Sequence, residues 1–203
     1  MKVLIACEYS GAVRDAFQAA GHEATSCDFL PSETIGAHYQ GDVFDIIGEG
    51  WDLMIAHPPC TYLSSSGLHW NSNPKSERFG GAQTEESLLF VRRLLDADIP
   101  RIVLENPVGC IGTRIRKASQ AIQPYNFGDD ASKNTCLWIK GLPLLRNTKR
   151  VQGRMVEWKG KMVERWANQT DSGQNKLAPS ADRWKDRSRT YPGIADAMAS
   201  QWG

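Results

Sequence analysis

The sequence predicts an α/β protein built on a doubly wound, mostly parallel β-sheet. Short apolar runs alternate with amphipathic helical patterns along most of the chain, which is typical of a sheet with helices on both faces. Polar clusters follow four of the apolar runs, at Glu8–Gly11, Asp28, His57–Cys60 and Glu105–Pro107. In an open parallel sheet such strand ends share one edge, where ligands bind. The sequence therefore predicts one site assembled from separate loops.

The first elements are two strands around a helix. Val3–Cys7 is a short apolar run that predicts a strand. A helical pattern through Val13 and Phe17 follows, and Gly21 ends it. Glu23–Asp28 predicts a second strand that ends in an acidic residue.

The middle of the chain predicts two buried strands around a loop and a helix. Asp52–His57 is nearly all apolar, so both of its faces are expected to be buried, and two prolines end it. Residues Ser64–Gly81 are rich in Ser, Asn, Gly and Pro and predict a long loop. An amphipathic helix is expected over Thr84–Ala97 and a buried strand over Arg101–Glu105.

The last third of the chain is less regular. Thr113–Ile122 predicts a helix and Thr135–Ile139 a late strand. Residues Arg146 to Arg189 carry many charges, little periodicity and three tryptophans. A final short helix is expected through Ala195 and Met198.

Composition limits the possible partners. The 203 residues hold 24 Lys and Arg against 23 Asp and Glu, a net charge of +1, which argues against a polycationic nucleic-acid coat protein. No apolar run approaches the roughly 20 residues of a membrane span, so no membrane partner is expected. The five cysteines show no zinc-ligand spacing, which predicts a cytoplasmic protein with reduced thiols and no metal site.

Three residues carry candidate chemistry. Cys60 lies in a stiff Pro-Pro turn, where it is either a packed thiol or a positioned nucleophile. Glu105 follows an apolar strand, where it is either a loop partner or an acid that activates an electron-poor heterocycle. Asp28 ends the second strand, a place where acids bind ribose hydroxyls. The first turn lacks GxGxxG, which fits a cofactor without pyrophosphate, such as S-adenosylmethionine.

These residues resemble the cytosine-5 DNA methyltransferases. PPCTYLS at Pro58–Ser64 is similar to that family's Pro-Pro-Cys loop, and VLENPVG at Val103–Gly109 to its Glu-Asn-Val segment. ACEYSG at Ala6–Gly11, followed by GHEATSCD at Gly21–Asp28, is similar to its first cofactor loop and second-strand acid. GDVFDI at Gly41–Ile46 resembles its cofactor-adenine segment.

The resemblance implies the S-adenosylmethionine-dependent methyltransferase (Rossmann-like) type of fold and assigns a role to each residue. Cys60 would attack ring carbon six of cytosine, and Glu105 would hold ring nitrogen three. S-adenosylmethionine would be bound by Glu8, Tyr9, Ser10, Gly11, Asp28, Asp42 and Pro58. The substrate would be bound by Pro59, Ser64, Asn106 and Lys133.

The resemblance also divides the chain. Residues 1–145 would be the catalytic and cofactor-binding core, 146–186 a short basic insert with tryptophans, and 187–203 a C-terminal helix that returns to the core. Family members that read DNA sequence carry a target-recognition domain at the insert, and this insert is thin for one. Its cations and tryptophans either track a phosphate backbone or form a solvated face with packed rings. The short chain resembles a phage-encoded member of the family.

The implied function is a DNA (cytosine-5-)-methyltransferase that uses a covalent cysteine intermediate, in the cytoplasm or, for a phage protein, in that of the host. Two alternatives remain open: the same chemistry on a free cytosine nucleotide, and a non-catalytic nucleotide- or nucleic-acid-binding protein on a degenerate methyltransferase fold. Since a target base must leave a duplex stack, Ser64–Gly81 is a candidate lid or wedge. His57 and His69, which flank it, are expected to be structural or to face phosphate.

Overall fold

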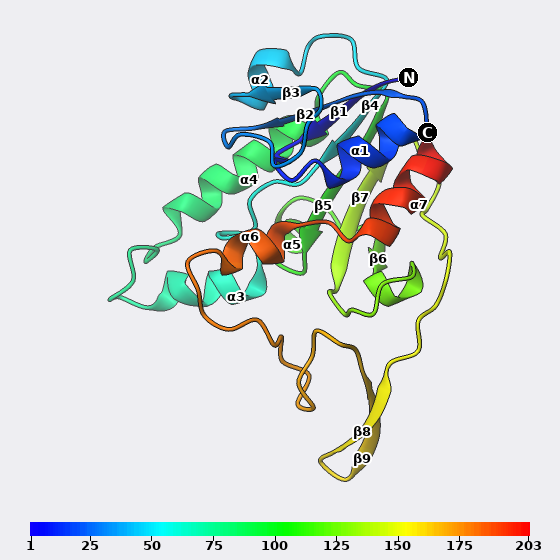
Figure 1. The fold of residues 1–203 in the computed structure, drawn as a ribbon. Helices are drawn as coiled ribbons and strands as arrows, with labels where there is room; N and C mark the ends of the chain where they lie inside the picture. Colours follow the sequence, from blue (N-terminus) through cyan, green and yellow to red (C-terminus); the bar gives the residue numbers. More distant parts are fainter.

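A seven-stranded sheet forms the centre of the molecule, and a separate two-stranded hairpin projects from it in the computed structural model, which describes all 203 residues (Figure 1). The order in the large sheet is β3-β2-β1-β4-β5-β7-β6. Only β7 runs antiparallel to its neighbours. This topology confirms the predicted fold class, a doubly wound and mostly parallel sheet. The strands are β1 Lys2–Ala6, β2 Glu23–Asp28, β3 His38–Gln40, β4 Leu53–Ala56, β5 Arg101–Pro107, β6 Gln120–Ile122 and β7 Thr135–Lys140, with β8 Arg154–Trp158 and β9 Lys161–Arg165 in the hairpin.

Helices cover both faces of the sheet (Figure 1). The α1 and α7 helices pack together on one face, and α2, α4 and α5 contribute to the core on the other. The helices are α1 Ala12–Ala19, α2 Val43–Ile46, α3 Ser65–Leu68, α4 Ala82–Leu95, α5 Ile111–Arg114, α6 Arg183–Ser188 and α7 Pro192–Trp202, with 3-10 turns η1 His69–Ser72 and η2 Pro124–Asn126.

Alternation along the central strands builds the two cores. Val3 and Ile5 of β1 face the α1 and α7 side, whereas Leu4 and Ala6 face the α2 and α4 side. All four side chains are fully buried. Because burying one large aliphatic side chain contributes about 1.5–3 kcal/mol, this two-sided burial anchors β1 at the middle of the sheet.

Two local predictions were wrong or incomplete. The helix expected over Thr113–Ile122 is absent: α5 ends at Arg114, and β6 forms instead by pairing with β7. The apolar spacing of Thr113–Ile122 suits a helix, but the pairing of β6 with β7 at the edge of the sheet overrides that local preference. The loop expected over Ser64–Gly81 contains α3 and η1.

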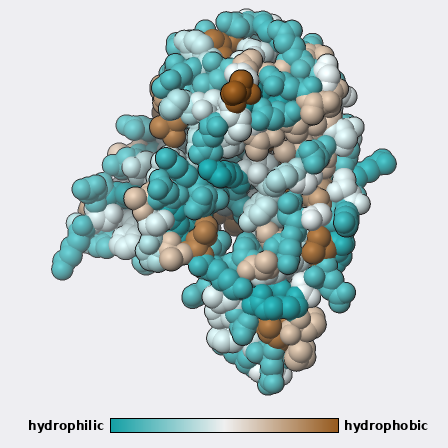
Figure 2. Space-filling view, in the orientation of Figure 1, coloured by the Kyte–Doolittle hydropathy of each residue, from teal (hydrophilic) through white to brown (hydrophobic).

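The β8–β9 hairpin lies in the basic segment and extends away from the sheet (Figure 1). Trp166, just after β9, stacks on Tyr125 with ring centroids 3.9 Å apart, and this contact attaches the hairpin base to the core. Trp158 and Trp184 are exposed. The face shown in Figure 2 is hydrophilic over most of its area, with apolar side chains scattered over it.

None of the helices has both the length and the apolar character that a bilayer crossing requires. The five cysteines are all free thiols. No group of three or more His, Cys, Asp or Glu side chains is arranged to hold a metal ion.

Candidate active site

The strand order creates a switch point between β1 and β4. From β1 the chain winds outward to β2 and β3, and then returns to β4 on the other side of β1 and continues to β5. The loops after β1 and β4 therefore diverge and leave a crevice at the carboxyl edge, which is where open α/β sheets bind ligands.

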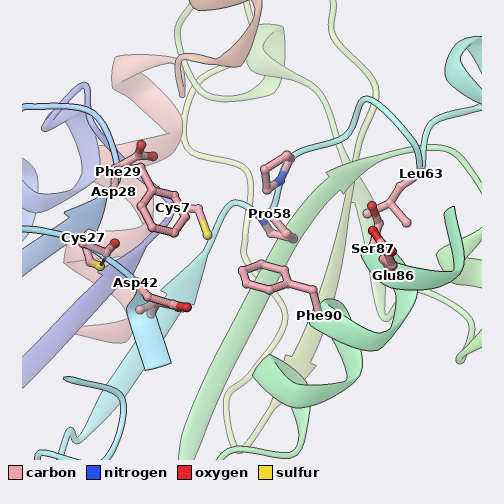
Figure 3. Close-up of a pocket in the computed structure, with 13 residues that line it drawn as sticks. Cys7, Cys27, Asp28, Phe29, Asp42, Pro58, Leu63, Glu86, Ser87 and Phe90 are labelled. Carbon is pink, nitrogen blue, oxygen red and sulfur yellow. Dashed lines mark hydrogen bonds between the residues drawn. The ribbon is translucent and has the colours of Figure 1, made fainter. Parts of the chain in front are cut away.

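A pocket of about 310 Å³ lies at this crevice (Figure 3). One wall comes from the ends of β1 and β2 and from the start of α2, and the opposite wall comes from the Pro-Pro turn and α4. The lining residues are Cys7, Cys27, Asp28, Phe29, Gly41, Asp42, Val43, Pro58, Pro59, Leu63, Glu86, Ser87 and Phe90.

Two carboxylates line the first wall. Asp28 Oδ1 accepts from the Leu30 backbone N–H at 3.0 Å, and burial raises the pKa of Asp28 despite that bond. Asp42 caps α2, with Oδ1 3.0 Å from the Phe44 nitrogen. Each carboxylate is thus oriented through one oxygen by its own backbone. Both carboxylates also line the pocket, where a ligand can reach them.

The four residues of the first loop do not line this pocket. The Glu8 carboxylate accepts from the backbone N–H groups of Val13, at 2.7 Å, and Arg14, at 3.2 Å, so it satisfies the first turn of α1. Ser10 donates to Glu8, and Gly11 begins the helix with a φ of 77°. Helix N-termini commonly bind anions. At α1 the Glu8 carboxylate already occupies this position. Contacts from Glu8, Tyr9, Ser10 and Gly11 to a cofactor stay a prediction.

The sequence analysis missed several lining residues. Phe29 directly follows the strand-end acid, and that position is the one sequence signal it offered. Phe90 lies on α4 outside the apolar stripe used to recognise that helix, and only the tertiary structure brings it to the pocket. Cys7 and Cys27 also line it. Burial raises the pKa of Cys7 strongly and that of Cys27 to about 12, so neither is a ready nucleophile.

Cys60 lies beside the pocket, in the loop after β4. It is exposed, while Pro58 before it is buried and Pro59 lines the pocket. The Asn106 amide donates to the Pro58 carbonyl at 2.7 Å and ties this loop to β5. Asn106, expected to bind substrate, is almost fully buried in this structural contact.

The loops after β4 and β5 are joined further along. Cys110 N–H donates to the Leu63 carbonyl at 2.9 Å, and Ser65 N–H donates to the Val108 carbonyl at 3.0 Å. Ser64, also expected to bind substrate, is buried and caps α3, with Oγ 3.3 Å from the Gly67 nitrogen. These bonds hold the two loops at a fixed spacing.

Gly109 permits this close approach. A Cβ there would overlap the Leu63 carbonyl. We expect Gly109→Ala to destabilise the protein by about 1–3 kcal/mol, as overpacking does, because both backbones are hydrogen-bonded and cannot separate freely. Urea unfolding measures this change. Gly112→Ala is the control, since a Cβ there meets no atom within 4 Å. Equal stabilities of the two variants would contradict the prediction.

Glu105 and Cys60 form a charged site. Glu105 Oε2 lies 3.3 Å from His57 Nδ1, and the Glu105 side chain is 12% exposed. Burial raises the pKa of Glu105, but the Lys133 charge and the His57 contact outweigh it, so the pKa is lowered overall. Desolvation of the sulfur by the surrounding loops and then the Glu105 charge raise the pKa of Cys60, although the residue is partly open to solvent, and Lys133 and Arg187 only partly offset this. In the free protein at neutral pH, sulfur therefore keeps its proton and the carboxyl is ionised.

The α6 segment packs over the first loop. Tyr9 Oη lies 3.0 Å from Ser188 Oγ, and the Tyr9 ring lies 6.0 Å from that of Trp184. Arg189 pairs with Glu33 at 2.8 Å, and Lys133 Nζ donates to the Arg189 carbonyl at 3.3 Å. Tyr9, expected to touch the cofactor, is thus a docking point for the C-terminal segment. This packing brings the Arg187 charge, which the sequence analysis missed, within reach of Cys60.

Comparisons with known proteins gave distant structural similarity alone. Neither a scan against protein-family models nor a search of curated proteins gave a match. A prophage-encoded E. coli protein described as a DNA modification methyltransferase is similar at 13% identity and a TM-score of 0.43, over 70% of this chain and 48% of that one. The S. pombe Dnmt2 methyltransferase is similar at 16% identity and a TM-score of 0.38, over 77% and 50%. The chain spans about half the length of both.

Proposed function

We propose that this protein transfers a methyl group from S-adenosylmethionine to carbon five of cytosine in DNA, through a covalent bond to Cys60. One observation carries the proposal: an exposed cysteine and an ionised glutamate, from the ends of neighbouring strands, share a charged site beside a pocket with two oriented carboxylates. The pattern of PPC, LENP and strand-end acids in the sequence supports the same chemistry.

The pocket fits the adenosine part of S-adenosylmethionine. Asp28 and Asp42 offer acceptors for ribose hydroxyls and for the adenine amine, and Phe29, Phe90 and Pro58 offer apolar surfaces for the purine ring. When bound, this cofactor supplies an electrophilic methyl group. The pocket's position beside Pro59 and Cys60 supports transfer to a base held at that cysteine.

Cys60 and Glu105 divide the activation of the base. The sulfur forms a bond to ring carbon six, the ring electrons move toward nitrogen three, and the proton that sulfur gives up is transferred to nitrogen three. Glu105 stabilises the proton that nitrogen three then holds, and Lys133 limits the charge of the site. Carbon five becomes nucleophilic and accepts the methyl group. Loss of the carbon-five proton to water, departure of sulfur and return of the nitrogen-three proton to it then restore the aromatic ring and the thiol.

Asp28 offers a test of the pocket itself. We expect Asp28→Asn to weaken S-adenosylhomocysteine binding about 10- to 100-fold, because a hydrogen bond to a charged acceptor contributes about 1.5–3 kcal/mol. Isothermal titration calorimetry measures this affinity. Asn retains an oxygen for the Leu30 N–H, so the loop should persist. Asp45→Asn is the control, since Asp45 lies on α2 but does not line the pocket. Equal affinities of the two variants would argue against the assignment.

The decisive experiment is covalent trapping. DNA that contains 5-fluorocytosine has no removable proton at carbon five, so an enzyme of this kind stays attached after methyl transfer. With S-adenosylmethionine present, we expect a denaturant-resistant adduct at Cys60. No adduct at saturating cofactor would overturn the proposal.

The same trapping assay tests whether the substrate is DNA or a free cytosine nucleotide. The segment between β7 and α7 holds only a two-stranded hairpin and the short α6 helix, so a free cytosine nucleotide is the second candidate substrate. Parallel reactions with 5-fluorodeoxycytidine monophosphate distinguish the two. An adduct with the nucleotide but not with DNA would favour this second candidate.

A further inference from the structure

His57 occupies an unusual place for a titratable side chain. It joins β4 to the Pro-Pro turn, and its backbone N–H donates to the Ala6 carbonyl at 2.9 Å. Its side chain is only 9% exposed, and ring Nδ1 lies 3.3 Å from Glu105 Oε2. Ring Nε2 is buried and has no hydrogen-bond partner in the protein. A buried polar ring with one unpaired nitrogen is costly, so its presence needs an explanation.

Three other side chains lie around Glu105: Lys133, Thr135 and Cys60. Lys133, which precedes β7, donates its ammonium to the Arg189 carbonyl at 3.3 Å. The Thr135 hydroxyl of β7 donates to the Lys133 carbonyl at 3.2 Å. Cys60, from the Pro-Pro loop, keeps its proton and bears no charge. His57 therefore contributes the ring nitrogen that lies within hydrogen-bond distance of Glu105 Oε2, and Thr135 is a second hydrogen-bond contact of the same carboxyl.

We propose that His57 is a positioning residue for Glu105: its Nδ1–H holds Oε2, so that Oε1 faces the pyrimidine edge. This inference rests on the proposed function, since it assigns Glu105 to the base. Glutamate has several freely rotating bonds, and ordering them costs free energy at each turnover unless the protein has fixed them beforehand. A carboxylate anchored through one oxygen presents the other in a fixed direction.

The two amide side chains give matched tests. The amide nitrogen of asparagine lies near the place of histidine Nδ1, and that of glutamine near Nε2. We expect His57→Asn to retain adduct formation within about threefold of wild type. His57→Gln and His57→Leu should lose about 10- to 100-fold, the usual cost of removing a group that orients a catalytic residue.

The pH profile separates positioning from simple stability. The His57 contact lowers the pKa of Glu105, so removing it raises that pKa. In His57→Leu the acid limb of the trapping rate should move to higher pH, while the Lys133 charge still lowers the pKa of Glu105. Asparagine keeps the hydrogen bond and should keep most of the wild-type profile. Equal losses in all three variants at every pH, in parallel with lower melting temperatures, would overturn the proposal.

A spectroscopic measurement tests the His57–Glu105 hydrogen bond independently of enzyme activity. In protein labelled with ¹⁵N-histidine, the His57 signals, identified by their loss in His57→Asn, should show a protonated Nδ1. Free neutral imidazole of histidine favours the proton on Nε2, so this is a distinct signature. A neutral ring with Nε2–H would refute the hydrogen bond. If wild type forms no adduct but Nδ1 is protonated, the proposed function fails while the His57–Glu105 contact stands.

Discussion

Replacing Cys60 by serine should abolish both the 5-fluorocytosine adduct and methyl transfer, with a loss on the order of 10³-fold or more. The serine hydroxyl is a far weaker acid than a thiol, so it supplies no useful nucleophile at neutral pH. The change is small and the site is exposed, so the fold should be unaffected. Mass spectrometry of the trapped complex and a radiolabelled methyl assay measure the two effects.

Cys136→Ser is the control for this change. Cys136 is a half-buried free thiol of β7 whose pKa is also raised by burial, so a general effect of thiol loss would appear in both variants. We expect it to keep wild-type trapping. An adduct that survives in Cys60→Ser, or that is lost equally in both variants, would show that Cys60 is not the nucleophile.

Glu105→Gln should change two measurements in opposite directions. Methyl transfer should fall about 10²- to 10³-fold, the usual cost of losing one group that stabilises developing charge. The Glu105 charge raises the pKa of Cys60, so removing it lowers that pKa and leaves more thiolate at pH 7.5. Alkylation of Cys60 by iodoacetamide should therefore be about three- to tenfold faster, since one pKa unit corresponds to a tenfold change in thiolate.

Two further variants test the sign of this effect. Lys133→Met removes a charge that lowers the pKa of Cys60, so its alkylation should be slower. Glu86→Gln removes a carboxylate from the α4 wall of the pocket and should leave the alkylation rate unchanged. Slower alkylation in Glu105→Gln would mean that the two groups are not coupled as described, whatever happens to methyl transfer.

Much of the fold followed from local pattern. β2 was predicted with its observed bounds. β1, β4, β5 and β7 were predicted within two residues, because each contains a continuous apolar run. The short β3 and α2 were missed, since three or four residues give too little periodicity. The helix predicted over Thr113–Ile122 failed because strand pairing with β7 outweighs local preference there.

The residues of the candidate site also differ in how far the sequence alone could predict them. Asp28 could be predicted as a pocket residue because it ends a recognisable strand, whereas Asp42 and Pro58 were expected only from the resemblance of their segments to a known family. The structural role of Glu8 could not, since an acid before a helix serves equally as a ligand contact and as a partner for the helix N–H groups. The packing roles of Ser64 and Asn106 likewise follow only from the contact between their two loops, and their contacts to a substrate stay a prediction.

The sequence by itself determined which residues end the strands and which chemical groups those ends carry. That information is local, because hydrophobic period and turn residues act over a few positions. Only the tertiary structure decided which of those ends meet. The strand order sets His57 against Glu105, and the return of the C-terminal segment brings Arg187 within electrostatic reach of Cys60. The protonation states of Cys60 and Glu105 depend on these long-range neighbours and on burial, which no short stretch of sequence encodes.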